Sequence, residues 1–288
     1  MLRRTFAASL AGLACAATSP RPPLTWWERR RRSPTRLLKR GPAPAEWRPH
    51  AAPPPIREVR VPGPTGPLLA WYAAPPGVTN APGLVYFHGH FSFAPSDFRR
   101  VRPFLDQGWA VMTPTLRGEN GNPGDFELLR GEVDDAIAAI AWFAAQPEVD
   151  PARIHTLGHS VGGALSALLA LVPDLPVVST VSVGGIYEPG TFVRWKNSAD
   201  NADLVRFDPA RPDERELRVP GPHVRELRRP HLALVGLDDE PIRRNARPIA
   251  EQARLLDVPF TLAPVDGDHA SSLDAAIASL RAGGFPGR

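Results

Sequence analysis

A serine flanked by glycines, at a point where a strand passes into a helix, constrains this chain more than any other feature. Residues 158–163 read Gly-His-Ser-Val-Gly-Gly; a short apolar run precedes them and an apolar helical pattern follows. The glycines lack Cβ atoms, so strand and helix can approach closely while the Ser160 hydroxyl stays exposed. The backbone N–H of Val161 then lies at a helix N-terminus, where it can donate to an oxyanion. We interpret Ser160 as a nucleophile.

Short apolar runs alternate with amphipathic stretches from residue 56 onward. Such runs are typical of strands buried on both faces, and repeats of about 3.6 residues are typical of helices. The first two strands, over 57–61 and 68–73, are interpreted as an antiparallel hairpin. Further strands are predicted over 84–87, 110–112, 154–157, 177–183, 232–235 and 260–263, and helices over 129–146, 162–171, 244–255 and 273–281. The alternation predicts a mostly parallel, doubly wound α/β sheet covered by helices on both faces.

A serine hydroxyl is a weak nucleophile, and it needs a base that is itself oriented by an acid. When the serine sits in a strand–turn–helix motif, the acid and then a histidine follow it along the chain. The histidines after Ser160 are His223, His231 and His269. We choose His269 as the base because it follows the final predicted strand. His231 instead begins a strand at its buried end, and His223 lies in a proline-rich segment.

Three carboxylates stand in a row after the strand at 232–235, namely Asp238, Asp239 and Glu240. Ligand chemistry gathers at the carboxyl ends of the strands in an open α/β sheet. Asp239 is our first choice for the acid, because the usual spacing is glycine, two residues, then aspartate. Asp238 is the second choice. Asp268, next to the histidine, is expected to shape its loop.

The sequence His-Gly-His at 88–90 ends another predicted strand. The loop after that strand supplies the second oxyanion donor in enzymes with this motif, so we assign the backbone N–H of His90 to that role. His88 and His159 also raise the alternative of a metal site. We favour packing and turn roles for both, since each already belongs to a motif. We therefore expect no metal and no cofactor.

The first 17 residues are interpreted as an export signal. Arg3 and Arg4 precede an apolar, small-residue-rich run that is too short to span a bilayer as a mature helix. This start is similar to twin-arginine signals, and it predicts a periplasmic or extracellular protein. Cys15, the single cysteine, leaves a lipid anchor open as an alternative, although Gly12 stands where the attachment motif has a branched apolar residue.

Residues 18–55 are predicted to be a linker rich in proline and arginine, because proline fixes φ and donates no backbone hydrogen bond. The tryptophans Trp26, Trp27 and Trp47 are expected to pack loosely on the domain surface. Four arginines follow one another at 29–32. One interpretation is weak contact with anionic lipid. The other, which we favour, is a solvated and disordered basic tail. No nucleic-acid partner is expected.

These motifs resemble the α/β-hydrolases, and within them the prolyl-oligopeptidase-like and dienelactone-hydrolase-like serine hydrolases. The resemblance rests on Tyr-Phe-His-Gly-His at 86–90, Arg-Gly at 117–118 with Gly121 and Gly124, Glu-Val-Asp-Pro-Ala-Arg-Ile at 148–154, and the motifs at 158–163, 236–239 and 267–269. It covers about residues 56–285 and implies an α/β-hydrolase fold for the domain at 56–288. Dienelactone hydrolases use a cysteine nucleophile, whereas this chain has serine there.

The segment from about 185 to 229 lies between two predicted core strands and is too long for an ordinary connection. We expect it to form a small lid whose residues line an acyl or leaving-group pocket, namely Tyr187, Phe192, Trp195 and Val205. The alternative is an irregular surface loop whose aromatic side chains cover the core.

The leading functional hypothesis is an exported serine hydrolase that cleaves a carboxylic ester or a related small acyl compound through an acyl-enzyme. A small peptidase or amidase is the runner-up. A catalytically silent binding protein on the same fold is the third alternative. Intact Ser160, Asp239 and His269 argue against a silent protein, since a binding module has no need of all three.

Overall fold

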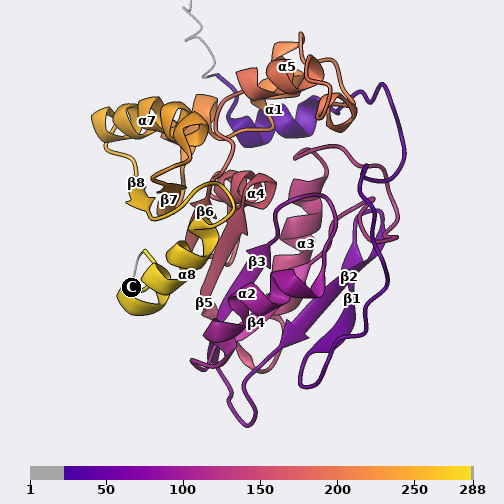
Figure 1. Ribbon diagram of the computed structural model, residues 1–288, viewed down its shortest axis with the longest axis vertical. Helices are drawn as coiled ribbons and strands as arrows, with labels where there is room; N and C mark the ends of the chain where they lie inside the picture. Colours follow the sequence, from indigo (N-terminus) through magenta and orange to yellow (C-terminus); the bar gives the residue numbers. More distant parts are fainter. Residues whose placement is uncertain (1–22, 287–288) are drawn as a thin grey trace, which may run out of the picture.

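Eight strands form a single twisted sheet in the computed structural model, which describes residues 23–286 (Figure 1). Their order is β1-β2-β4-β3-β5-β6-β7-β8. At one edge, β1 (Arg57–Gly63) and β2 (Gly66–Ala73) form the predicted antiparallel hairpin. The parallel strands are β3 (Ala81–Phe87), β4 (Ala110–Pro114), β5 (Val149–His159), β6 (Ser179–Val183), β7 (His231–Gly236) and β8 (Phe260–Val265). The prediction of a mostly parallel α/β sheet is confirmed.

Helices cover both faces of this sheet because its central strands are apolar on both sides. Helices α3 (Glu132–Ala144), α4 (Val161–Leu169) and α7 (Glu240–Leu255) pack on one face, and α2 (Pro95–Leu105) and α8 (Ser272–Gly283) on the other. Neighbouring residues of β3 enter opposite cores: Leu84 packs with the α2 and α8 side, whereas Val85 packs with the α3 and α4 side.

Among the helices that cover the sheet, α3 and α2 differ most from the sequence prediction. Helix α3 begins at Glu132 and not near position 129, because Leu128 and Leu129 have φ angles of 54° and 67°, which do not occur in a right-handed helix. Helix α2 is absent from the prediction. Its charged residues hide a simple pattern, in which every third side chain from Phe98 to Phe104 is apolar and buried.

The strand order brings two loops together at the carboxyl ends of the central strands. Strand β3 lies between β4 and β5, so the chain leaves β3 to one side, forms β4, and then crosses back to form β5 on the other side. Loops that diverge in this way leave a crevice at the carboxyl ends of the strands, where ligands bind in open α/β sheets. Residues 88–90 follow β3 and Ser160 follows β5, so both lie at this crevice.

The N-terminal segment packs on the domain instead of forming a linker. Residues Trp26–Arg32 form helix α1, which Thr25 caps with its side chain. The Trp26 side chain is fully buried, and its indole N–H donates to the Leu217 carbonyl at 3.2 Å. Its backbone N–H donates to the Glu226 carboxylate at 2.6 Å. The linker prediction is therefore wrong for this segment.

Two of the four arginines of α1 are paired with carboxylates of the folded domain. Arg29 lies 2.8 Å from Asp213 and 3.2 Å from Glu216, and Arg30 is buried against Asp134 at 2.7 Å. These partners lie more than 100 residues further along the chain, so no local pattern could indicate them. The favoured interpretation of a disordered basic tail is wrong for these two arginines.

The insertion between β6 and β7 lies beside α1 at one end of the molecule (Figure 1). It consists of four short helical segments, namely α5 (Gly190–Lys196), η1 (Ala202–Leu204), α6 (Pro212–Glu216) and η2 (Gly221–Glu226). Phe192, Val205 and Phe207 enter the same core as Trp26. The insertion and α1 therefore form one layer that is fixed to the domain by apolar contacts and ion pairs.

Replacing Trp26 with alanine tests whether this layer is part of the folded domain. The change removes a fully buried indole, and large-to-small core substitutions of this kind cost about 3–5 kcal/mol. We expect Trp26→Ala to lower the free energy of unfolding by about that amount, measured by urea denaturation. Trp47, which is 43% exposed, is the matched control, and its replacement should cost less than about 1 kcal/mol. Equal losses for the two variants would contradict the assignment.

Candidate active site

Ser160 occupies a tight turn between β5 and α4. Its φ and ψ angles are 54° and −118°, a conformation that costs a residue with a side chain on the order of 1–3 kcal/mol. The glycines around it are required by space. A Cβ on Gly158 would lie 1.9 Å from the Gly162 carbonyl oxygen, and one on Gly162 would lie 2.2 Å from the Phe87 carbonyl oxygen. The structure thus places Ser160 in the predicted strand–turn–helix motif.

Three of the predicted site residues lie in one chain of hydrogen bonds. The Nε2 atom of His269 is 3.0 Å from Ser160 Oγ, and its Nδ1 atom is 2.6 Å from Asp239 Oδ2. A carboxylate can only accept, so Nδ1 carries the proton and Nε2 presents a lone pair to the serine hydroxyl. Asp239 is buried, whereas Asp238 is exposed. The geometry therefore favours Asp239, the first choice, over Asp238.

The histidine loop is held from two sides. His159 lies behind it, with Nε2 2.7 Å from the His269 carbonyl oxygen. Burial lowers the pKa of His159 to about 4, so the ring is neutral at pH 7 and Nε2 donates to that carbonyl. Asp268 accepts the backbone N–H groups of Ala270 and Ser271 at 3.0 and 2.8 Å. The expected loop-shaping role of Asp268 agrees with these contacts.

The loop after β3 lies against the nucleophile. A Cβ on Gly89 would lie 2.7 Å from His159 Nδ1 and 3.5 Å from the Ser160 Cβ. His90 follows with a φ of 64°. On the other side, Val161 is the first residue of α4, where a backbone N–H has no carbonyl partner within its own helix. The two residues expected to donate to an oxyanion therefore flank Ser160.

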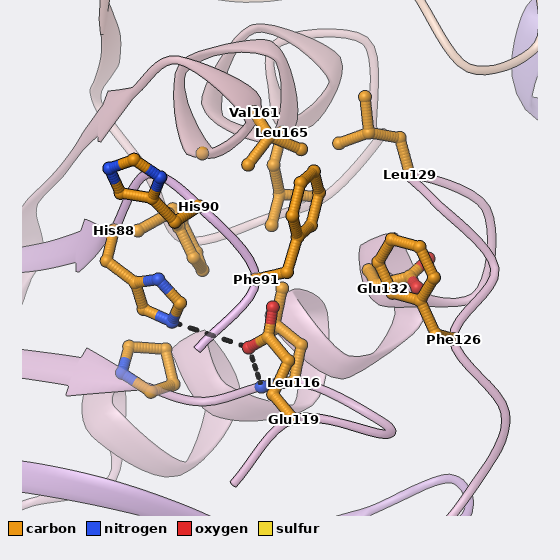
Figure 2. A pocket seen from close by; sticks show the side chains of 13 residues that line it. His88, His90, Phe91, Leu116, Glu119, Phe126, Leu129, Glu132, Val161 and Leu165 are labelled. Carbon is orange, nitrogen blue, oxygen red and sulfur yellow. Dashed lines mark hydrogen bonds and ion pairs between the residues drawn. The ribbon is translucent and has the colours of Figure 1, made fainter. Parts of the chain in front are cut away.

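An apolar pocket opens beside these two residues (Figure 2). Val161 and Leu165 of α4 lie along one side of it, and Phe91 and Leu129 reach into it from loops. Its lining also includes Phe87, His88, His90, Pro114, Leu116, Glu119, Phe126, Glu132 and Gly162. Seven of its thirteen lining residues lie in loops, which have no periodic pattern, so the pocket could not be predicted from the sequence.

The insertion residues that we expected to line a pocket do not line this one. Tyr187, Phe192 and Val205 are buried in the core, and Trp195 stacks edge-on against Phe192 with ring centroids 6.2 Å apart. The lining prediction is wrong for this pocket, and the alternative of aromatic side chains covering the core agrees with the structure.

The two rejected candidates for the base, His231 and His223, are buried and bonded elsewhere. His231 is buried at the start of β7, with Nδ1 2.7 Å from Thr180 Oγ1, and burial lowers its pKa to about 3. His223 is buried in the insertion, 3.6 Å from Glu226. Within residues 23–286, no group of three or more His, Cys, Asp and Glu side chains has a metal-binding arrangement. None of the helices described is both long enough and apolar enough to cross a bilayer.

Comparison with known proteins finds a family whose model matches most of this chain. A family model described as X-Pro dipeptidyl-peptidase (S15 family) matches residues 25–246. The uncharacterized peptidase YtmA of Bacillus subtilis (strain 168) is 27% identical over 146 residues, which cover 49% of this chain and 56% of YtmA. The α/β-hydrolase domain-containing protein WAV2 of Arabidopsis thaliana is 24% identical over 189 residues, 60% of this chain and 58% of WAV2. The chain thus matches little more than half the length of either relative.

Solved structures share the fold. A Mycobacterium tuberculosis puromycin-hydrolyzing peptidase superposes with a TM-score of 0.65 at 23% identity, over 78% of this chain and 38% of that protein. The carboxylesterase EstE1, cloned from a metagenomic library, gives a TM-score of 0.63 at 22% identity, over 81% of this chain and 90% of its own. At these identities the likeness establishes the α/β-hydrolase fold alone.

The two neighbouring aspartates provide a matched test of the site. Asp239→Asn places an amide opposite His269 Nδ1, which disfavours the ring tautomer with a lone pair toward Ser160. We expect kcat for a reactive ester to fall on the order of a thousandfold or more. Asp238→Asn alters an exposed carboxylate and should change kcat little. A larger loss in Asp238→Asn than in Asp239→Asn would identify Asp238 as the acid.

Proposed function

This chain belongs to the X-Pro dipeptidyl-peptidase (S15) family and is a serine hydrolase, and we propose that it cleaves a carboxylic ester or a related acyl compound through an acyl-enzyme on Ser160. The observation that carries the proposal is the continuous chain of hydrogen bonds from Ser160 through His269 to Asp239. A nucleophile, a base and an orienting acid are the three groups that acyl transfer to serine requires.

The proposed reaction follows from these contacts. His269 Nε2 accepts the hydroxyl proton as Ser160 Oγ attacks the acyl carbon, and Asp239 stabilises the imidazolium that forms. The N–H groups of His90 and Val161 donate to the negative oxygen of the tetrahedral intermediate. His269 then returns the proton to the leaving alcohol, and the acyl-enzyme remains. Water, activated by the same histidine, completes hydrolysis.

The pocket beside the site supports a compact apolar acyl group. His90 and Val161 both line it, so an acyl group bonded to Ser160 with its oxygen near their N–H groups extends toward the pocket. Phe91, Phe126 and Leu129 surround that space with apolar surface. Apolar pockets of this kind select by shape and by the area that they remove from water. Short aliphatic or small aromatic acyl groups therefore fit the proposal best.

A peptidase or amidase is the second candidate, and the family supports it. The S15 description names a dipeptidyl-peptidase, and the relative YtmA is named a peptidase. Acylation of Ser160 is the same step for an ester and an amide; only the leaving group differs. A catalytically silent protein is the third alternative, and the intact contacts among Ser160, His269 and Asp239 argue against it.

Replacing Ser160 with alanine tests the nucleophile. We expect Ser160→Ala to keep the fold, to lose labelling by a fluorophosphonate, and to lose on the order of a thousandfold or more in kcat. A panel of nitrophenyl esters with short and long acyl chains, set against aminoacyl anilides, separates the two enzyme candidates. Faster turnover of short esters supports the esterase, and faster turnover of anilides supports the peptidase. Wild-type activity in Ser160→Ala would exclude both.

We further propose that residues 1–17 direct export across a bacterial inner membrane. The proposal rests on Arg3, Arg4 and the short apolar run after them; all of these lie outside the described residues. An export signal of this kind is removed from the mature protein, which here would begin near Ala17. A lipid anchor at Cys15 is the alternative, and it would hold the protein at a membrane.

Cell fractionation with N-terminal sequencing tests this proposal. We expect a mature N-terminus near Ala17 in the periplasmic or extracellular fraction. An intact Met1 in the cytoplasmic fraction would refute export. A blocked N-terminus at Cys15 in the membrane fraction would support the lipid anchor instead of the free form.

A further inference from the structure

Two consecutive residues of the loop after β4 hold both ends of the loop that carries His90. Asn120 accepts the backbone N–H of Phe93 at 2.8 Å and donates to the Phe93 carbonyl at 2.9 Å. Glu119 lies 3.4 Å from His88 Nε2 and accepts the backbone N–H of Leu116 at 2.9 Å. Figure 2 shows the Glu119 carboxylate between these two partners. The loop at 88–93 is therefore fixed from outside at its first and last residues.

The His88 ring is buried, and an oxygen atom faces each of its two nitrogens. Its Nδ1 atom lies 2.8 Å from the Gly89 carbonyl oxygen, which can only accept a hydrogen bond. Its Nε2 atom faces the Glu119 carboxylate. A neutral ring would turn one lone pair toward an oxygen, so this pair of neighbours favours the doubly protonated ring. Burial acts to lower the pKa of His88. The negative charge of Glu119 acts in the opposite direction, and the net result is a pKa raised to about 9.

The contact with Gly89 sets the direction of the next N–H group. In a trans peptide, the Gly89 carbonyl and the His90 N–H point in opposite directions. Because the carbonyl is turned toward the His88 ring, the N–H is turned away from it. This peptide lies beside Ser160, and His90 itself has a φ of 64°, which is unfavourable for a residue with a side chain. The orientation of the peptide therefore needs an external contact to hold it.

We propose that His88 and Glu119 are positioning residues that aim the His90 N–H at the oxyanion formed on Ser160. The proposal rests on the proposed function, since it needs an oxyanion at that place. A donor aimed at the transition state affects kcat more than KM, because the charge on the oxygen develops only during reaction. Glu119 and His88 line the acyl pocket, but neither contacts the reacting atoms in this scheme. Glu119 acts through His88, and His88 acts through the Gly89–His90 peptide.

The proposal predicts an alkaline limit to activity. Below its pKa of about 9, the His88 ring is charged, so its Nδ1 atom donates to the Gly89 carbonyl while its Nε2 atom faces the Glu119 carboxylate as an ion pair. As pH rises through that value, the His88 ring loses one of its two protons. The Glu119 carboxylate stabilises the proton on Nε2, so the proton on Nδ1 is the one lost. The Gly89 carbonyl then has no donor. Asp97 of α2 also raises the pKa of His88. Other titratable groups near this loop are Glu132 of α3, whose pKa burial raises to about 7, His90 within the loop, and the rings of His159 and His269.

The substitution Glu119→Gln tests whether His88 and Glu119 position the His90 N–H. Without the carboxylate, burial dominates and His88 loses its second proton at a lower pH. We expect kcat for a good ester to fall on the order of 10–100-fold at pH 8, with KM little changed, and the alkaline limb to move to lower pH. His88→Asn keeps an amide donor in the place of Nδ1 without a titrating ring. It should retain more kcat than Glu119→Gln above pH 8 and show no alkaline limb near pH 9.

Glu148→Gln is the control for loss of a carboxylate as such. Glu148 accepts the Tyr72 hydroxyl at 3.0 Å and lies just before β5, whereas Ser160 follows the other end of that strand. Its replacement should lower thermal stability and leave the pH profile unchanged. The same profile in wild type and Glu119→Gln would overturn the proposal, as would a loss of kcat in Glu119→Gln that is equal at every pH between about 6 and 10.

The rate of fluorophosphonate labelling at Ser160 provides a second readout. Labelling also places negative charge on an oxygen next to the nucleophile, so it depends on the same N–H groups and needs no known substrate. If Ser160 is labelled but no ester or anilide turns over, the proposed function fails while Glu119→Gln still reports on the pair through its labelling rate. Equal labelling rates in wild type and Glu119→Gln across this pH range would refute the positioning role.

Discussion

The close approach of three backbones at Ser160 is the constraint on which the rest of this site depends. The end of β5, the start of α4 and the end of β3 meet so tightly that a Cβ on Gly162 would lie 2.2 Å from the Phe87 carbonyl oxygen. This contact brings the N-terminus of α4 and the loop after β3 to the same serine. It also requires the positive φ of Ser160, which the surrounding sheet and helix must stabilise. The proposed oxyanion donors, His90 and Val161, come from distant parts of the sequence and become neighbours only because glycine leaves this space.

The features predicted from sequence are those that local chemistry determines. The strands could be predicted because a strand buried on both faces has few polar residues, and His269 could be predicted because it is the histidine that follows the last strand. Helix α1 could not, since Trp26 is held by Leu217 and Glu226, about 190 to 200 residues away. The choice of Asp239 over Asp238 rested on spacing, and the contact with His269 agrees with it.

The layer formed by α1 and the insertion shows how buried charge makes such long-range contacts specific. Arg218 is fully buried and pairs with Glu214 at 2.7 Å, and both reach the N-terminal segment: Arg218 donates to Thr35 Oγ1 at 2.6 Å, and Glu214 accepts the Thr35 hydroxyl at 2.8 Å. Buried ion pairs add little net stability compared with apolar contacts, because each charge loses its water. Removing one partner alone is costly, however, so a network of this kind tolerates few alternative arrangements. It gives the N-terminal segment one position on the domain.

The chain between β4 and α3 connects the pocket to the oxyanion loop. Its end is held by Glu132, whose carboxylate accepts the backbone N–H groups of Glu127, Leu128 and Arg130 at 2.7, 3.1 and 2.9 Å. These bonds stabilise the left-handed Leu128 and Leu129 and so fix the wall of the pocket. The same segment carries Glu119 and Asn120, which hold the loop at 88–93. A substitution that moved this segment to admit a larger acyl group would therefore also disturb the proposed oxyanion donor, so pocket size and transition-state stabilisation are coupled through one stretch of chain.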